Sequence, residues 1–227
     1  MNIVEDYVAV VFAGGRGNRM LSITEHIPKH LLPIINIPLF WFPLNLLQRN
    51  GFKECLLIVP KTKSAFVNKL LSDGSLPSLD QLKVTISSFD DEEEGAEEFG
   101  TADKKNILIV SGDLITDLTL EEMLKFHEKE NSVLTCLLTD SPLSGPIPGT
   151  NERPKKYRDF VLFSPETNQL LYLIDEDDFG DDEKFPASLF KSSPHIQTSA
   201  KYKDIHLYAI KRDALNSLKN SKYFLIN

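Results

Sequence analysis

The sequence has few cysteines and no long apolar run, and both absences narrow the class of protein. Cys55 and Cys136 are the only cysteines among 227 residues, and no CxxC spacing occurs, so neither a zinc site nor a disulfide framework can be built. Both are expected to be reduced core residues. No apolar run approaches the roughly 18 residues that a membrane span needs, and the amino-terminal Met-Asn-Ile-Val-Glu-Asp is acidic rather than basic. These features favour a soluble protein of the cytosol.

Positive charge is also scarce. The 25 basic side chains against 33 acidic ones give a formal charge of -8, which opposes the phosphate neutralisation that drives nucleic-acid binding. We therefore expect no direct contact with nucleic acid. The windows 90–98 and 175–183 each hold seven acidic residues, a density that resists burial and favours exposed loops. Two interpretations of these windows stay open: solvated loops, or docking sites for basic partners.

The residues that are present favour one α/β domain. Apolar side chains make up 41 % of the chain, enough for one sizeable core, so we expect a single domain over 1–227. Short apolar runs alternate with amphipathic ones, an order that predicts a parallel sheet with crossover helices. The predicted strands are Tyr7–Phe12, Glu54–Val59, Lys83–Phe89, Asn106–Ser111 and Ser132–Thr139, and the predicted helices are Pro38–Gln48, Lys61–Ser72 and Met123–His127. Thr119, with Glu122 three residues on, predicts a capping box for the last of these helices.

The pattern changes after the fifth strand. Residues 141–156 are crowded with proline, glycine and charge and lack periodicity, which indicates a loop. Arg158–Phe163 and Gln169–Ile174 then predict a β-hairpin, because only Ser-Pro-Glu-Thr-Asn lies between them. A late strand over Ile205–Ile210 and a short helix over Arg212–Leu218 complete the prediction.

The most informative segment is the glycine-rich Ala13-Gly-Gly-Arg-Gly-Asn-Arg-Met, which follows the first predicted strand and precedes Ile27-Pro-Lys-His-Leu-Leu-Pro. Glycines after a buried strand let backbone amides approach a phosphate, and a nearby arginine and lysine can hold its charge. The segment is not a P-loop, since no Gly-Lys-Ser/Thr closes it. Nor is it a dinucleotide fingerprint, since Met20 stands where a third glycine belongs. A purely structural turn is the alternative.

Together, these two segments resemble the signature of the sugar-phosphate nucleotidyltransferases. The resemblance implies a Rossmann-like nucleotidyltransferase fold, with a mainly parallel mixed sheet flanked by helices. It implies that Gly14, Gly15 and Gly17 face a nucleotide, Arg19 the phosphates and Lys29 the transition-state charge. Ser111-Gly-Asp-Leu-Ile-Thr-Asp matches the place of a metal-binding aspartate, which makes Asp113 the implied magnesium ligand. The alternatives are a solvated surface lysine for Lys29 and a turn-capping carboxylate for Asp113.

Longer segments narrow the resemblance to the gamma-type subunits of the exchange complex for eukaryotic translation initiation factor two, the two-B complex. They are the Pro-Lys-His-Leu-Leu-Pro segment, Phe40-Trp-Phe-Pro-Leu-Asn-Leu-Leu-Gln-Arg-Asn-Gly-Phe, the Asp113 segment, Tyr157-Arg-Asp-Phe and His206-Leu-Tyr-Ala-Ile. This likeness extends from the first strand to about residue 210. It implies assembly with an epsilon-type catalytic subunit and other subunits, with initiation factor two as client. In such relatives the chain continues into a left-handed β-helix, so we expect the domain to be truncated here.

The sequence departs from active nucleotidyltransferases. Ser22-Ile23-Thr24 stands where Pro-Leu-Thr is usual, and Asn18 replaces a small hydroxyl residue. No convincing sugar-phosphate lysine or second metal carboxylate follows; Glu183-Lys184-Phe185-Pro186 matches only by coincidence. Because nucleotidyl transfer depends on charge stabilisation, we expect no catalysis and no bound cofactor, with Arg19 and Lys29 as degenerate counterparts and the glycine loop as a vestigial nucleotide or magnesium site. The alternative hypothesis is a working sugar-1-phosphate nucleotidyltransferase.

The connection before Asp113 is short. Gly100-Thr-Ala-Asp is followed at once by Lys104, whereas parallel neighbours need a crossover of about a dozen or more residues. We therefore expect either an irregular connection or missing residues in this region.

Overall fold

The computed structural model describes residues 3–14, 21–24, 27–89, 104–140, 159–175, 189–192 and 195–214, together with Phe185 and Ala187. The chain divides into two compact units, Met1–Leu137 with His206–Asn227 and Leu138–Ile205. Both acidic windows, except Asp175, and most of the short connection before Lys104 lie outside the described residues.

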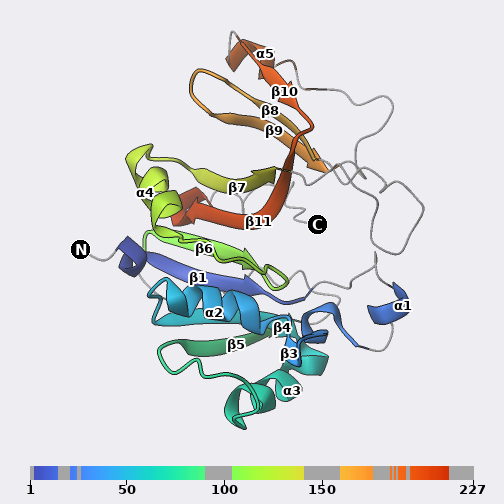
Figure 1. Ribbon diagram of the computed structural model, residues 1–227. Helices are drawn as coiled ribbons and strands as arrows, with labels where there is room; N and C mark the ends of the chain where they lie inside the picture. The colour runs from blue at the N-terminus through green and yellow to red at the C-terminus, as the bar shows by residue number, and fades with distance from the viewer. Residues whose placement is uncertain are drawn as a thin grey trace. The chain divides into compact units, whose positions relative to one another are not determined.

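A six-stranded mixed sheet organises the first unit (Figure 1). Its strand order is β5-β4-β1-β6-β11-β7. The strands are β1 (Tyr7–Phe12), β4 (Glu54–Pro60), β5 (Lys83–Phe89), β6 (Asn106–Ser111), β7 (Leu134–Asp140) and β11 (Tyr202–Lys211). The first four of these are mutually parallel, and β11 pairs antiparallel with β6. The predicted fold, a mainly parallel mixed sheet with helices against it, is confirmed.

The central strands are parallel and buried because their sequences are almost wholly apolar. β1 and β6 are flanked by strands on both sides and buried along most of their length. Their sequences are therefore continuous apolar runs, without alternation of apolar and polar residues. Val10, Ile58, Ile107, Ile109 and Ile210 form one buried cluster. That cluster joins residues from four strands, so it stabilises their order as well as their burial.

Three longer helices connect these strands. They are α2 (Trp41–Arg49), α3 (Lys61–Ser72) and α4 (Glu121–Lys129); the short elements of this unit are η1 (Ile3–Asp6), α1 (Leu21–Thr24) and η3 (Lys29–Leu31). The helix α2 packs along β1, and α3 packs along β4 and β5. The predicted capping box of Thr119 and Glu122 before α4 is wrong. The N-cap of α4 is Leu120, which has no side-chain cap, and the amide oxygen Oδ1 of Asn50 accepts the N–H of Leu120 at 2.8 Å.

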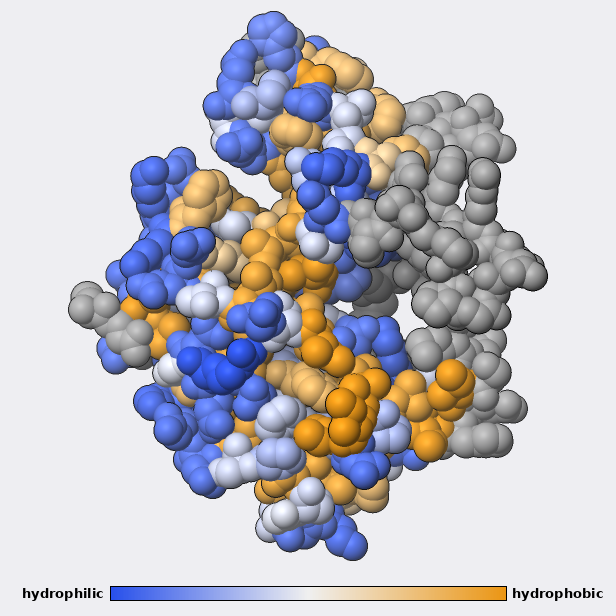
Figure 2. All heavy atoms as spheres, in the orientation of Figure 1, coloured by the Kyte–Doolittle hydropathy of each residue, from blue (hydrophilic) through white to orange (hydrophobic). Residues whose placement is uncertain are grey.

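The predicted helix over Pro38–Gln48 begins later than expected, at Trp41, because Pro38 belongs to a small hairpin. β2 (Pro33–Ile34) pairs antiparallel with β3 (Ile37–Pro38), and Ile35 and Asn36 make the turn with positive φ angles of 51° and 65°. Ile35 is 91 % exposed at the tip of this hairpin. Figure 2 shows hydrophobic surface where Figure 1 draws β3.

The second unit contains a three-stranded antiparallel sheet of order β10-β8-β9. Its elements are β8 (Asp159–Phe163), β9 (Leu170–Asp175), α5 (Leu189–Ser192) and β10 (Gln197–Ser199). The predicted hairpin of β8 and β9 is confirmed, with Asp159 opposite Asp175. Lys203 reaches both carboxylates, with its Nζ at 2.8 Å from Asp159 and 3.5 Å from Asp175.

Other predictions concern single residues and short segments. Neither cysteine forms a disulfide bond among the described residues; Cys55 is buried as expected, whereas Cys136 is only partly buried. The helix expected over Arg212–Leu218 is described for residues 212–214 alone. None of the helices within the described residues is long and apolar enough to cross a membrane.

Candidate functional site

The carboxyl ends of β1 and β6 lie side by side, because Phe12 pairs in register with Ser111. The Gly112 N–H donates to the Phe12 carbonyl at 2.7 Å, and the Ala13 N–H donates to the Ile58 carbonyl at 2.8 Å. A Cβ atom on Gly112 would lie 2.5 Å from that Phe12 oxygen and 2.8 Å from the Cα of Ala13. Only glycine therefore fits between the two strand ends, and this close approach brings the chain after β6 against the start of the glycine loop.

Lys29 and Asp113 form an ion pair at this edge of the sheet. The Lys29 Nζ donates to Oδ2 of Asp113, and the Ser111 hydroxyl donates to Oδ1 of the same carboxylate. Lys29 begins η3, which follows Pro28, and Asp113 lies in the turn after β6. Both carboxylate oxygens are thus engaged by donors from the chain itself.

The environment of Asp113 favours its ionised form. Partial burial alone would raise the pKa of this carboxyl, but the hydrogen bonds from Lys29 and Ser111, together with the charge of Lys29, outweigh burial and hold the pKa below its usual value. Asp113 is therefore negatively charged at neutral pH, and Lys29 balances that charge.

His30 lies beside this pair and is only 3 % exposed. Neither ring nitrogen has a hydrogen-bond partner within the part of the chain that the structure describes. Burial, with a smaller contribution from the charge of Lys63, lowers the pKa of His30 to about 4, so the ring is neutral at physiological pH. His30 lines a small cavity of about 50 Å³ with Phe12, Ala13, Lys29, Ser111, Gly112 and Asp113.

An aromatic ring covers Gly14. A Cβ atom on Gly14 would lie 2.5 Å from Cζ and 2.7 Å from Cε1 of Phe89, the last residue of β5. A larger residue at this position would require the ring of Phe89 to move. The space directly against Gly14 is filled by a side chain of the same sheet.

Comparison with known proteins places this strand-end arrangement in a family. Residues 8–144, which include Lys29 and Asp113, match the family described as Nucleotidyl transferase. The chain belongs to the nucleotidyl transferase family. Within the match lie the glycine loop, the ion pair and every strand of the parallel part of the sheet.

The curated relatives divide into two kinds. The chain is 32 % identical over 223 residues to translation initiation factor eIF2B subunit gamma of Caenorhabditis elegans, an overlap of 94 % of this chain and 54 % of that protein. It is 25 % identical over 224 residues to the subunit of the same name in Schizosaccharomyces pombe, covering 96 % of this chain and 48 % of that protein. It is 36 % identical to glucose-1-phosphate thymidylyltransferase of Neisseria gonorrhoeae over only 66 residues, 29 % of this chain and 23 % of that protein. The chain thus spans about half the length of the gamma subunits that it matches.

The structure brings together two of the residues predicted from the nucleotidyl transferase resemblance, because Lys29 and Asp113 form an ion pair. Gly14 follows the end of β1, against the ring of Phe89. Gly15, Gly17 and Arg19 lie outside the described residues, so their roles stay predictions. Sequence reasoning missed His30, Gly112 and Phe89 as members of this site. Gly112 and His30 lie next to predicted residues in the sequence, whereas nothing near Phe89 signals its contact with Gly14.

The described donors do not fit the magnesium ion that a nucleotidyl transferase resemblance implies. A magnesium ion takes near-octahedral oxygen ligands from carboxylates, water and phosphates. Among the described residues, Asp113 is the only carboxylate that lines the small cavity, and it already accepts hydrogen bonds from Lys29 and Ser111. No group of three or more histidine, cysteine, aspartate or glutamate residues stands together in the described ranges. We therefore derive no step through a metal.

Proposed function

We propose that the chain is the nucleotidyl transferase-family portion of a gamma-type eIF2B subunit, working in the cytosol as a non-catalytic module of an exchange complex. The observation that carries this proposal is identity and coverage taken together. The chain is 32 % identical to the Caenorhabditis elegans gamma subunit over 94 % of its length. It is 36 % identical to the thymidylyltransferase over only 29 % of its length, and 24 % identical to the catalytic subunit beta of mannose-1-phosphate guanylyltransferase of Xenopus tropicalis over 83 %. Neither transferase therefore matches the gamma subunit in both identity and coverage.

The geometry at Asp113 supports the absence of nucleotidyl transfer. Charge stabilisation supplies most of the catalysis in phosphoryl-type transfer, so the carboxylate and the lysine must both act on phosphates or metal. Here the carboxylate of Asp113 and the ammonium of Lys29 bind each other instead. To work on a nucleotide, Asp113 and Lys29 would have to separate, and their ion pair and the Ser111 hydrogen bond to Asp113 oppose that separation.

The mechanism we propose is architectural. The chain would assemble with an epsilon-type subunit that carries the exchange activity, and the complex would act on initiation factor two. Exchange requires a protein that binds two states of its client differently. In this proposal the epsilon-type subunit supplies that difference, and the chain supports its partner.

Co-expression with an epsilon-type subunit tests the assembly directly. We expect the two chains to co-elute as one stable complex in size-exclusion chromatography. Glucose-1-phosphate thymidylyltransferase, co-expressed in the same way, is the matched control and should not form a complex with the chain. A chain that elutes alone beside the epsilon-type subunit would contradict the proposal.

The same preparation tests the transferase alternative. Pyrophosphate release from nucleoside triphosphates and hexose 1-phosphates, with magnesium, should not exceed the background without protein. Lys29→Ala should leave that background unchanged. Release that depends on the chain and drops in Lys29→Ala would establish a working nucleotidyl transferase and overturn the non-catalytic role.

A further inference from the structure

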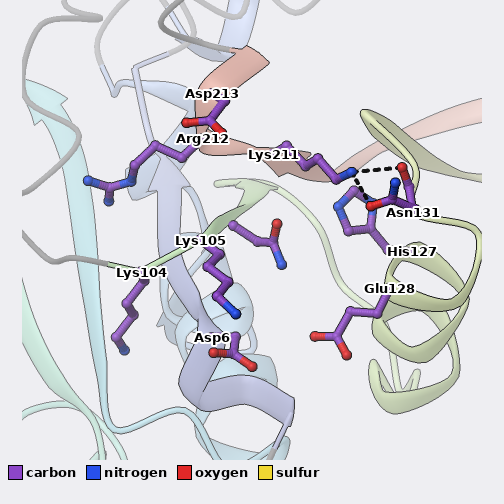
Figure 3. Close-up of a pocket in the computed structure, with 10 residues that line it drawn as sticks. Asp6, Lys104, Lys105, His127, Glu128, Asn131, Lys211, Arg212 and Asp213 are labelled. Carbon is purple, nitrogen blue, oxygen red and sulfur yellow. Dashed lines mark hydrogen bonds between the residues drawn. The ribbon is translucent and has the colours of Figure 1, made fainter.

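A second, larger cavity lies at the opposite edge of the main sheet from Lys29 and Asp113. It has a volume of about 590 Å³ and lies where β1 and β6 begin and β11 ends. The Arg212 N–H donates to the Lys105 carbonyl at 3.0 Å, which holds the end of β11 against the start of β6. Figure 3 shows side chains from both strands, from α4 and from Asp6 around this space. Its size falls in the range of roughly 300 to 1,000 Å³ typical of small-molecule sites.

Charged side chains of both signs line this cavity. Four cationic residues, Lys104, Lys105, Lys211 and Arg212, stand against three carboxylates. Lys104 pairs with Glu54, at 3.3 Å. The ammonium of Lys211 donates to the backbone and side-chain oxygens of Asn131, the first at 2.8 Å. Those oxygens are neutral, so they fix the position of the ammonium without cancelling its charge. Lys105 is exposed and has no ion-pair partner among the described residues.

His127 adds a buried polar atom to the same cavity. It is 1 % exposed, its Nδ1 lies 2.8 Å from the hydroxyl of Thr135, and its Nε2 is buried without a hydrogen-bond partner in the described part of the chain. A buried polar atom left without a partner costs roughly 1–3 kcal/mol, so it is uncommon without a reason. Figure 3 shows the ring projecting from α4 beside the end of Lys211.

The protonation of His127 suits an anionic partner. Burial first, and then the nearby charge of Lys211, lower the pKa of His127, so the free ring is neutral at physiological pH. When the Thr135 hydroxyl donates to Nδ1, the neutral ring carries its proton on Nε2 and can donate it to an acceptor that displaces the atoms covering it.

We propose that this cavity binds the phosphate group of a small organic phosphate, held by the ammonium groups of Lys105 and Lys211 and by the Nε2–H of His127. This site is separate from the glycine loop and does not depend on the proposed subunit role. Charge-assisted hydrogen bonds to phosphate are among the strongest that a partly exposed site can make. The carboxylates of Asp6 and Glu128 in the lining are acceptors for hydroxyl groups of the same ligand.

Calorimetric titration of the 227-residue chain with pyrophosphate, glucose 6-phosphate and GDP tests the proposal, with glucose as the arm without phosphate. Nitrogen NMR of the histidine rings follows the same titrations. We expect saturable binding of at least one phosphate compound, none of glucose, and a shift of the His127 Nε2 signal. The ranking of the three compounds identifies which source of phosphate the cavity prefers.

Substitutions of single lysines test whether the phosphate binds in this cavity. Lys105→Gln, at an exposed position that should leave folding intact, is expected to weaken binding by about tenfold, the loss of one charge-assisted hydrogen bond. Lys211→Gln should weaken it similarly. Lys125→Gln removes the same charge from α4 outside the cavity and should not change affinity. Absence of saturable binding for all three phosphates, or undiminished binding in Lys105→Gln, or binding lost in Lys125→Gln, would overturn the proposal.

Discussion

The pairing of Lys29 with Asp113 determines how much charge the carboxyl edge of the sheet can offer to a ligand. Each of these side chains, taken singly, has the chemistry that nucleotide transfer needs. Together they form a neutral pair, because the ammonium and the Ser111 hydroxyl engage both carboxylate oxygens. Two side chains that could each bind a ligand therefore bind each other in the folded chain.

Replacing Lys29 by methionine should raise the pKa of Asp113 above its value in the parent chain. In the parent chain the folded pKa is below the unfolded value of about 3.9, so the carboxylate contributes stability above that value, which is lost as the pH falls through the folded pKa. Without Lys29, burial still raises the pKa, and only the hydrogen bonds from Ser111 and the backbone oppose it. Lys29→Met should therefore destabilise the chain at pH 7, and the difference from the parent should shrink as the pH falls below about 4. Urea unfolding across this pH range measures it.

Two further variants make that test specific for the ion pair. Lys29→Arg keeps the charge and should stay close to the parent at both ends of the pH range. Adding Asp113→Asn to Lys29→Met removes the buried charge and should recover much of the lost stability at pH 7. An Asp113 pKa that is the same with and without Lys29 would show that the pair contributes nothing.

The sequence predicted some residues of this site and not others, for a physical reason. Lys29 and Asp113 stand in recognisable local motifs, so they could be named. Gly112 lies against the backbone of Phe12, and Gly14 lies against the ring of Phe89. Such contacts arise only when segments far apart in the sequence meet, and no local pattern encodes their distances.

At the level of elements, Asn50 joins the end of α2 to the start of α4. Its amide nitrogen donates to the carbonyls of Leu46 at 2.9 Å and Leu118 at 3.3 Å, and its oxygen accepts from Leu120 at 2.8 Å. Asn50→Ala removes all three bonds and leaves the N–H of buried Leu120 without its acceptor. We expect a loss of about 1–3 kcal/mol in the free energy of unfolding. Thermal unfolding should show a melting temperature lower by at least several degrees.

Ser64→Ala is the matched control for that change. The Ser64 hydroxyl also donates to a helix carbonyl, that of Lys61 at 2.9 Å, but it does so on the exposed surface of α3. We expect its effect to stay within about 0.5 kcal/mol, as for most surface substitutions. Equal losses for the two variants would mean that Asn50 acts only within its own helix.

The elements that the sequence predicted best are those with local signals. β1, β5, β6 and α3 have the predicted ends, because apolar or amphipathic runs stop at clear turn residues. The hairpin of β2 and β3 was missed because a β-branched residue rarely occupies the left-handed turn position that Ile35 takes. The place of β11 between β6 and β7 was also unpredictable, since strand order depends on long-range packing.

At the level of the whole molecule, the chain has two compact units with separate sources of stability. The cluster of Val10, Ile58, Ile107, Ile109 and Ile210 belongs entirely to the first unit. In the second unit, buried Asp159 accepts from the Lys203 ammonium and from the Asp204 N–H. Burial alone would lower the pKa of Lys203, but its hydrogen bond to Asp159 and the charges of Asp159 and Asp175 outweigh burial and raise it.

Asp159→Asn should therefore loosen the second unit and leave the first intact. An asparagine can accept only one of the two hydrogen bonds, and its own NH2 group then faces the other donor, a mismatch that costs about 1–3 kcal/mol in a buried site. Hydrogen exchange should quicken in β8, β9 and β10 and stay unchanged in β1, β4 and β6. Asp140→Asn, which breaks the exposed ion pair with Lys201, should change neither set. If exchange in β1 accelerates as much as in β8, the chain unfolds as one cooperative body, and the division into two units has no energetic meaning.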